Sequence, residues 1–385
     1  MHERKDVVEF CSRLISTNSV SGNEEKVASI IQDKMRELGY DEVGTDELGS
    51  VYGIIRGGIP KTIMFEGHMD TVDISDYSRW DTDPFNATIK DGRMYGRGTS
   101  DMKSAVGCMV IAGGDIVKLD YEKRPTVIVV GVIFEEIFEG KAFGNMLEHF
   151  HPDAVVNGES TNHYLMKGQK GRAEIEIITH GKNAHSAHPE KGINAIMRMN
   201  DVLSKLKSLK CPEDDKIGKG LMIVTDIISS PYPGASVIPD RCRITIDRRL
   251  VLGETEESVI NELESEIEGD ESVRSIGLVT AEVTTYKGAK LKAERFFPAW
   301  VTEDDEPIMK AAKAAIADVG EPVETNIYQF CTDASECAGR RNIPTVGYGP
   351  GNSNLAHIDN EYVEIDDLYR VTEVYVNIVR HFAEM

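Results

Sequence analysis

The sequence contains no apolar run close to the length of about 20 residues that a membrane-spanning helix needs. Its first ten residues, MHERKDVVEF, lack the apolar core of a signal peptide. The six cysteines are scattered, without the close spacing of a zinc ribbon or a disulfide framework. These absences predict a soluble, cytoplasmic protein whose thiols are reduced.

Positive charge is also scarce. The chain has 43 Lys and Arg residues against 65 Asp and Glu, which gives a formal net charge of −22. This excess argues against binding nucleic acid through its phosphates and against docking on an anionic membrane. A chain of 385 residues with 41% hydrophobic content exceeds what one compact core usually organises, so we expect two domains, and this organisation favours an enzyme with a cleft.

The larger part of the chain has the pattern of an α/β domain. A Ser-x-x-Glu capping box at Ser21, followed by apolar residues at helical spacing as far as Gly39, predicts an amphipathic helix. Residues 101–119 predict a second helix. Strand-like apolar runs without polar alternation occupy 62–66, 126–134, 153–157 and 343–349. Such strands, separated by helices, predict a mainly parallel sheet sandwiched by helices.

The pattern of apolar and polar residues changes between residues 171 and 288. Here the order strand, helix, strands, helix, strand predicts a small α+β unit of ferredoxin-like type, inserted into the larger domain. Residues 1–170 and 289–385 then form the domain that we expect to carry the chemistry.

Polar residues follow the predicted strands at the points where they end. Because the carboxyl ends of parallel strands meet at one edge of a sheet, residues that are distant in sequence can converge there. One further acid begins the helix after the first strand. These residues are His68, Asp70, Asp101, Glu135, Glu136, Glu159 and His357.

Two imidazoles and three carboxylates suit a pair of divalent metals, each held by one histidine and one carboxylate, with the third carboxylate bridging. A further free carboxylate serves as general base, which is the chemistry of metal-assisted amide hydrolysis. Each motif alone has a simpler reading: His68 as a strand-end cap, Asp101 as a helix N-cap, and the pair Glu135 and Glu136 as a solvated turn.

Taken together, the motifs resemble those of a known family. GHMDTVD, GRGTSDMK, FEE, NGES, GKNAHSAHPEKGINA and AHIDNEY occur in the order found in the dinuclear-zinc exopeptidases and deacylases of metallopeptidase clan MH. Its members include succinyl-diaminopimelate desuccinylase, acetylornithine deacetylase, aminoacylase and glutamate carboxypeptidase. The stretches SVSGNEEKV and YDEVGTDELGSVYGII are similar to a branch linked to selenium and purine catabolism.

The resemblance implies a role for each residue of the cluster. His68 and Glu159 would hold one metal, Glu136 and His357 would hold the other, Asp101 would bridge them, Glu135 would be the general base, and Asp70 would orient His68. It also implies a cis peptide bond after Asp101. The metals would be zinc, with cobalt and manganese as alternatives.

Further residues take their expected roles from the same resemblance. In the inserted dimerisation or lid domain, His185, rather than His188, would stabilise the oxyanion across the interface of a homodimer. Arg249, with Arg248 beside it, would bind a substrate carboxylate. The loop containing Gly349 and Gly351 would accept the substrate.

Two positions depart from the family pattern. Phe134 stands where the family usually has Asp, and Ser236 stands where many relatives have Asn. Both leave the ligands unchanged. The expected function is hydrolysis of an amide bond in a small carboxylate-bearing molecule such as an N-acyl amino acid. A dipeptidase or carboxypeptidase is an alternative, and a noncatalytic binding protein is another, although such a protein needs no free base.

Overall fold

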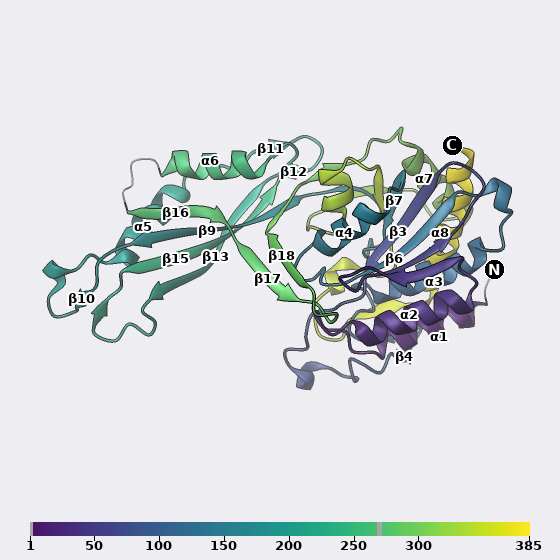
Figure 1. Ribbon diagram of the computed structural model, residues 1–385, viewed down its shortest axis with the longest axis horizontal. Coiled ribbons are helices and arrows are strands. Elements are labelled where there is room, and N and C mark those ends of the chain that lie inside the picture. Colours follow the sequence, from purple (N-terminus) through teal and green to yellow (C-terminus); the bar gives the residue numbers. More distant parts are fainter. Residues whose placement is uncertain (1–2, 268–271) are drawn as a thin grey trace. The chain divides into compact units, whose positions relative to one another are not determined.

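The computed structural model describes residues 3–267 and 272–385, and the chain divides into two compact units. Unit 1 comprises Met1–Gln169, Glu282–Leu291 and Val301–Met385, and unit 2 comprises Lys170–Ala281 and Lys292–Trp300. Figure 1 labels the elements of both.

Unit 1 contains a nine-stranded sheet in the order β1-β2-β6-β3-β7-β22-β8-β20, with β21 beside β8. The central pairs β3 with β6, β3 with β7, and β7 with β22 are parallel, whereas β1, β2 and β6 are joined antiparallel. The strands are β1 (Glu42–Thr45), β2 (Val51–Ile55), β3 (Thr62–His68), β6 (Thr126–Val132), β7 (Ala154–Asn157), β8 (Leu165–Gln169), β20 (Trp300–Val301), β21 (Thr325–Tyr328) and β22 (Thr345–Gly347).

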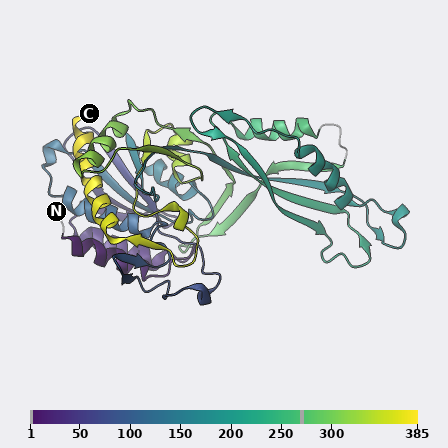
Figure 2. The same ribbon diagram turned by 180° about the vertical axis from the view of Figure 1, so that it is seen from behind.

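Helices pack on this sheet, as the sequence predicts. Figure 1 shows α4 in front of the strands, and Figure 2, seen from behind, shows α8 on the other side. Helix α3 packs on β3 and β6 and is covered by α1 and α8. Every residue of its sequence KSAVGCMVIAGGDI is buried, as expected for a helix that is apolar on all sides. The helices are α1 (Arg4–Ile15), α2 (Glu25–Glu37), α3 (Lys103–Ile116), α4 (Lys141–His149), α7 (Pro307–Asp318) and α8 (Ile365–Glu384).

A small antiparallel sheet of unit 1 lies in the order β23 (Tyr362–Glu364), β5 (Arg93–Tyr95), β4 (Thr88–Lys90). It brings the segment after His357 alongside the segment that leads to Asp101. In the part of the chain that the structure describes, no helix combines the length and the apolar character that crossing a bilayer requires.

Unit 2 follows the order β9, α5, β13, β15, α6, β16, and its sheet is antiparallel in the order β13-β15-β9-β16, with β19 also paired to β9. The order strand, helix, strands, helix, strand is the predicted one, but the strand that closes the sheet is β16 and not the alternating segment TAEVTTYK at 280–287. The main elements are β9 (Gly171–His180), α5 (Ala195–Leu206), β13 (Leu221–Ser230), β15 (Arg241–Leu250), α6 (Glu256–Glu266) and β16 (Val273–Leu278).

Short strands complete the chain: β10 (Ala184–His185), β11 (Glu213–Asp214), β12 (Gly218–Lys219), β14 (Val237–Ile238), β17 (Thr280–Thr284), β18 (Lys290–Glu294) and β19 (Phe296–Phe297). The helix side of the unit 2 sheet forms a buried core in which Ile175, Ile177, Ile244 and Ile246 meet Met199 of α5. Alternate residues of β9 and β15 supply this core, which explains the period-2 pattern in the sequence.

One prediction about the start of a helix is wrong. Helix α2 begins at Glu25 with Glu24 at its N-cap, so Ser21 does not cap it. The Ser21 hydroxyl instead donates to Asp70 Oδ2 at 2.6 Å. A capping hydroxyl would accept a backbone N–H of the helix, whereas this hydroxyl donates to a buried carboxylate, which is a stronger partner.

Candidate metal centre

The candidate metal centre lies at the carboxyl ends of the parallel strands of unit 1. His68 is the last residue of β3, and Glu159 lies two residues beyond the end of β7. Glu135 and Glu136 follow β6, and His357 follows β22. The parallel pairing of these strands brings their ends together, which is the convergence that the sequence predicts.

Asp101 lies between the two histidines. Its Oδ1 is 2.9 Å from His68 Nε2, and its Oδ2 is 3.0 Å from His357 Nε2. One carboxylate thus presents a different oxygen to each imidazole. This is the arrangement that a bridging ligand between two cations requires.

A further carboxylate lies beside each histidine. Glu159 Oε1 is 3.4 Å from His68 Nε2, and Glu136 Oε2 is 2.9 Å from His357 Nε2. The donor atoms of His68, Glu135 and Glu159 lie within 4.8 Å of one another, as do those of His68, Asp101 and Glu136. The nitrogen and oxygen donors are those that divalent zinc, cobalt and manganese accept.

The electrostatics of the cluster also fit bound cations. Burial raises the pKa of Glu136 to about 7, and the negative charge of Asp101 adds to this shift. Burial likewise raises the pKa of Glu135 well above its usual range. Hydrogen bonds to Asp101 and Glu136 raise the pKa of His357 to about 10. The protein therefore gathers more negative charge than its two histidines neutralise, and divalent cations would relieve that charge.

Asp70 supports the cluster from behind. His68 Nδ1 lies 3.0 Å from the backbone oxygen of Asp70 and 3.7 Å from its Oδ1, so the backbone carbonyl is the nearer partner of the imidazole. This contact holds the Nδ1 proton, so Nε2 can offer its lone pair to a metal ion on the side that faces Asp101. The Asp70 carboxylate accepts the backbone N–H groups of Glu135 and Glu136 at 3.1 and 3.3 Å. Asp70 thereby orients the loop of the expected base through its carboxylate and the imidazole of His68 through its backbone carbonyl.

Glu361 supports the other side of the cluster. It is fully buried, and its carboxylate accepts the backbone N–H groups of Gly98, Ser100 and Asp101 and a hydrogen bond from Arg97 Nη1 at 2.8 Å. The sequence indicates only a surface or supporting residue here. Its partners lie about 260 residues earlier in the chain, so local sequence carries no signal for them.

A buried pair of acids that the sequence analysis missed adjoins the cluster. Burial raises the pKa of Glu66, on β3, to about 7, and burial followed by the charge of Glu66 raises the pKa of Asp333 well above its usual range. Asn157 Nδ2 donates to Glu66 at 2.7 Å, and the N–H of Gly140 donates to Asp333. The one available signal is an acid inside the apolar run of β3.

Two expected site residues belong to unit 2. His185 is exposed at the end of β10, and its Nδ1 accepts the N–H of Ala187 at 3.0 Å. Arg249 Nε lies 2.9 Å from Asp247 Oδ1. Arg248 is buried and pairs with Glu254 and Glu262, so Arg249 is the more accessible guanidinium of the two.

The two expected substrate-binding glycines have close neighbours within unit 1. A Cβ on Gly349 would lie 1.9 Å from the backbone oxygen of Gly158, and a Cβ on Gly351, whose φ is +84°, would lie 2.6 Å from Ser100 Oγ. Packing alone therefore requires glycine at both positions. The cis peptide bonds of the described residues are Ser230–Pro231 and Tyr232–Pro233, so the cis bond expected after Asp101 is wrong. The trans form is the one that a non-proline bond favours.

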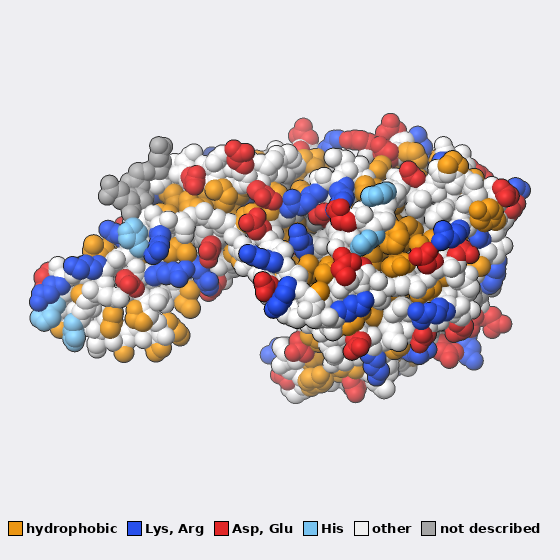
Figure 3. Space-filling model, in the orientation of Figure 1, with side chains coloured by type: hydrophobic (Ala, Val, Ile, Leu, Met, Phe, Trp, Pro, Cys, Tyr) orange, Lys and Arg blue, Asp and Glu red, His pale blue; other side chains and the backbone are white. Residues whose placement is uncertain are grey.

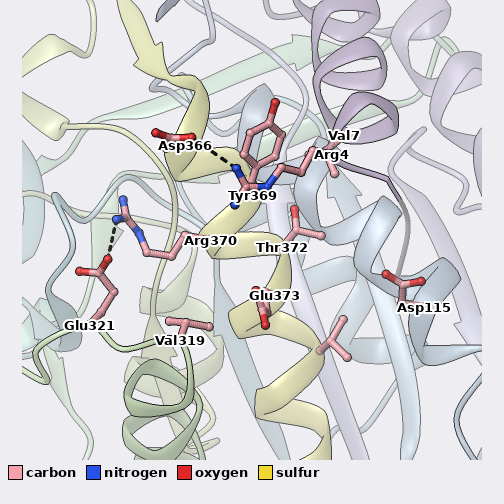
Figure 4. A pocket seen from close by; sticks show the side chains of 11 residues that line it. Arg4, Val7, Asp115, Val319, Glu321, Asp366, Tyr369, Arg370, Thr372 and Glu373 are labelled. Atoms are coloured by element: carbon pink, nitrogen blue, oxygen red, sulfur yellow. Dashed lines mark hydrogen bonds and ion pairs between the residues drawn. The ribbon is translucent and has the colours of Figure 1, made fainter. Parts of the chain in front are cut away.

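A separate cavity of about 370 Å³ lies between helices of unit 1 (Figure 4). The Arg4 guanidinium lies 4.7 Å from the ring centre of Tyr369 and 4.0 Å from Asp366. Arg370 Nη1 donates to Glu321 at 2.8 Å. Both arginines of this cavity are thus already engaged.

Comparisons with known proteins identify the family to which the chain belongs. The sequence model of Peptidase family M20/M25/M40 matches residues 64–381. The chain is 32% identical over 378 residues to the uncharacterised protein YgeY of Escherichia coli strain K12, covering 97% of this chain and 93% of that protein. It is 26% identical over 392 residues to a succinyl-diaminopimelate desuccinylase of Wolbachia pipientis subsp. Culex pipiens, covering 98% of this chain and 93% of that protein.

Among solved structures, the aminopeptidase PepT of Bacillus cereus has a similar fold, with a TM-score of 0.75 at 21% identity. The match covers 99% of each chain. Both units therefore belong to one shared architecture.

Proposed function

We propose, since this chain belongs to peptidase family M20/M25/M40, that it is a hydrolase with two bound metal ions that cleaves an amide bond of a small carboxylate-bearing substrate. The observation that carries the proposal is the position of Asp101, whose two carboxylate oxygens face His68 and His357 separately. A noncatalytic metal-binding protein could use the same bridge, but it would not need a further buried acid beside it.

The ligand set follows from the contacts. His68 and Glu159 would hold one ion, His357 and Glu136 would hold the other, and Asp101 would bridge both. Zinc is the expected metal, with cobalt or manganese as alternatives. Two bound cations supply a water molecule of lowered pKa and polarise the carbonyl of the substrate.

Glu135 is the proposed general base. Its Oε2 lies 3.7 Å from His68 Nε2, farther than the carboxylate oxygens of Asp101 and Glu159. Its buried side chain has a raised pKa, which suits a group that accepts the proton of the attacking water and then donates it to the leaving amine nitrogen.

Unit 2 supports the proposal of a homodimer. Its sheet ends at β13, an edge strand on which Leu221, Ile223, Val224, Ile227 and Ile228 are exposed. Figure 3 shows hydrophobic side chains on this unit, with histidine, lysine and arginine gathered at the end where β10 lies. An unpaired apolar edge readily pairs with another strand, here that of a second copy. His185 of a partner subunit would then stabilise the oxyanion.

The substrate class rests on chemistry and on one relative. Arg249 offers a planar, half-buried guanidinium for a carboxylate. The similarity to a desuccinylase favours N-acyl amino acids. The loop of Gly349 and Gly351 would accept the substrate backbone. The six free cysteines are consistent with a cytoplasmic location.

An amine-release screen tests the function. The metal-loaded chain is incubated with N-acetyl and N-succinyl amino acids and with dipeptides, and a chelated sample serves as the control. Amine release from the N-acyl compounds alone would support a deacylase activity. Amine release from the dipeptides alone would instead indicate a peptidase. If no compound of the panel releases amine while two metals are bound, the result would favour a noncatalytic binding protein.

A further inference from the structure

The turn Ser21–Glu24 contacts the back of the candidate metal centre. The Ser21 hydroxyl donates to Asp70 Oδ2 at 2.6 Å, the N–H of Ser21 donates to the backbone oxygen of Thr71 at 3.3 Å, and the N–H of Thr71 donates to the backbone oxygen of Ser19 at 3.0 Å. The turn is thus joined to the loop that follows β3 by main-chain and side-chain bonds.

The same turn also contacts the loop of the proposed base. Phe134 adopts the left-handed region with φ +57°, an unfavourable conformation for a bulky residue. Its ring lies against Gly22, where an added Cβ would be 3.3 Å from Phe134 Cζ, and Gly22 itself has φ +94°. A side chain at position 22 would therefore crowd the Phe134 ring, and the positive φ of Gly22 also favours glycine there. The two residues after Phe134 are Glu135 and Glu136.

Glu24 closes the turn as a fully buried carboxylate. Its Oε1 accepts the N–H of Gly22 at 2.8 Å. Burial, followed by the negative charge of Asp70, raises the pKa of Glu24 to about 7, while backbone hydrogen bonds from Gly22, Glu24 and Phe134 oppose the shift. Burying an acid costs stability. Departures of this kind from the rules of folding are expected where function requires a particular geometry.

Asp70 connects these contacts to the chemistry. One of its oxygens accepts the N–H of Glu135, and the other accepts both the N–H of Glu136 and the hydroxyl of Ser21. The Ser21 bond therefore holds the carboxylate that holds the backbone of both glutamates. A hydrogen bond to a carboxylate is among the stronger bonds that a hydroxyl makes.

We propose that the turn Ser21–Glu24 positions the general base: through Asp70 and Phe134 it sets the backbone of Glu135 and Glu136 relative to His68. This inference rests on the proposed function for the role of Glu135. Ser21 and Glu24 are positioning residues, since neither is placed against the reacting atoms. From sequence alone, the same Ser-x-x-Glu pattern predicts a helix capping box.

Amide hydrogen exchange in the full-length, metal-loaded chain tests the contact without any substrate. In Ser21→Ala, exchange at the amides of Glu135 and Glu136 should be about tenfold faster. The Asp70 carboxylate that accepts both amides would no longer be held by the Ser21 hydroxyl. Ser21→Thr keeps a hydroxyl and should restore slow exchange. Ser78→Ala is the matched control, since Ser78 donates to Asp76 at the same 2.6 Å on the exposed surface. Exchange in β22 should stay unchanged in all three variants.

Glu24→Gln is a second variant for the same turn, because it replaces one oxygen of the buried carboxylate by an NH₂ group, which cannot accept a backbone N–H. It should also speed exchange at Glu135. Unchanged exchange at Glu135 and Glu136 in both Ser21→Ala and Glu24→Gln would overturn the inference.

Turnover separates this inference from the function it rests on. With a substrate from the amine-release screen, Ser21→Ala should lower kcat about tenfold at an unchanged KM and with two metals bound, and Ser21→Thr should recover it. Faster exchange with full kcat in Ser21→Ala would overturn the positioning role. Faster exchange in a chain that hydrolyses nothing in the screen would overturn the proposed function and leave the contact established.

Discussion

Glu361 Oε1 accepts the backbone N–H of Asp101 at 3.1 Å, so a buried carboxylate lies directly beneath the residue that joins the two histidines. The same oxygen accepts the N–H of Ser100 at 2.7 Å, and Arg97 donates to the other oxygen. The loop before α3 is therefore organised around one acid from the segment after His357.

Glu361→Gln tests that organisation. The amide NH₂ would face backbone N–H donors, so we expect the free energy of unfolding to fall by about 1–3 kcal/mol and metal affinity to fall with it. Chemical denaturation of the chelated protein and competition with a chromophoric chelator measure the two effects. Glu364→Gln is the control, because its pair with Arg93 is half-exposed. Equal behaviour of both variants would mean that Glu361 is only a surface residue.

Asp101→Asn tests the bridge. An amide offers one oxygen and one NH₂ group, so it cannot ligate on both sides. We expect metal content to fall from two per chain to one or less, and turnover to fall by about two orders of magnitude or more. Elemental analysis after dialysis gives the metal content. Asp73→Asn, at an exposed aspartate whose Oδ1 accepts the N–H of Ile74, should keep both metals. Two tightly bound metals in Asp101→Asn would exclude the bridging role.

Much of this site can be predicted from sequence, and the reason is local. His68, Glu135 and Glu159 each follow an apolar strand, where a polar residue is conspicuous. Ser21 and Glu361 could not be placed in the same way. The acceptor of Ser21 is 49 residues away, and its Ser-x-x-Glu pattern equally fits a helix cap. An acid such as Glu361 in a polar loop is usually exposed. This one is buried in the folded chain, where β23 pairs with the distant strand β5.

The pH dependence of stability reports on Glu24. Its pKa in the folded chain is raised to about 7, above the value near 4.5 of an unfolded glutamate, so between these values the folded state binds more protons than the unfolded state. The contribution of Glu24 to the free energy of unfolding is fully present below pH 4.5 and is lost as the pH rises through 7. The stability of Glu24→Gln relative to the parent should therefore increase between pH 5 and pH 8, by on the order of 1–3 kcal/mol.

Urea denaturation of chelated parent and variant at both pH values measures that difference. Glu25→Gln, next in the chain and exposed, is the control for the loss of one carboxylate at this end of the helix. A pH-independent difference for Glu24→Gln would mean that the Glu24 carboxylate titrates normally.

Ile223→Lys tests the homodimer. Ile223 is 58% exposed on the edge strand β13, so a buried lysine there would oppose pairing with a second copy. We expect a monomer by light scattering after size-exclusion chromatography, with turnover lowered because His185 of the partner would be lost. Ile89→Lys, on β4 of unit 1 at 53% exposure, should remain dimeric and active. A fully active monomer of Ile223→Lys would refute the role given to His185.

The most direct test of the central claim is metal content and turnover measured together in Glu135→Gln. If Glu135 is the base and not a ligand, Glu135→Gln should keep two metals per chain, and its kcat should be about 10²–10⁴-fold lower than that of the parent. Glu136→Gln, one residue along, should instead lose metal. If Glu135→Gln hydrolyses the substrate at the parental rate, or loses its metals while Glu136→Gln keeps them, the assignment of base and ligand is contradicted.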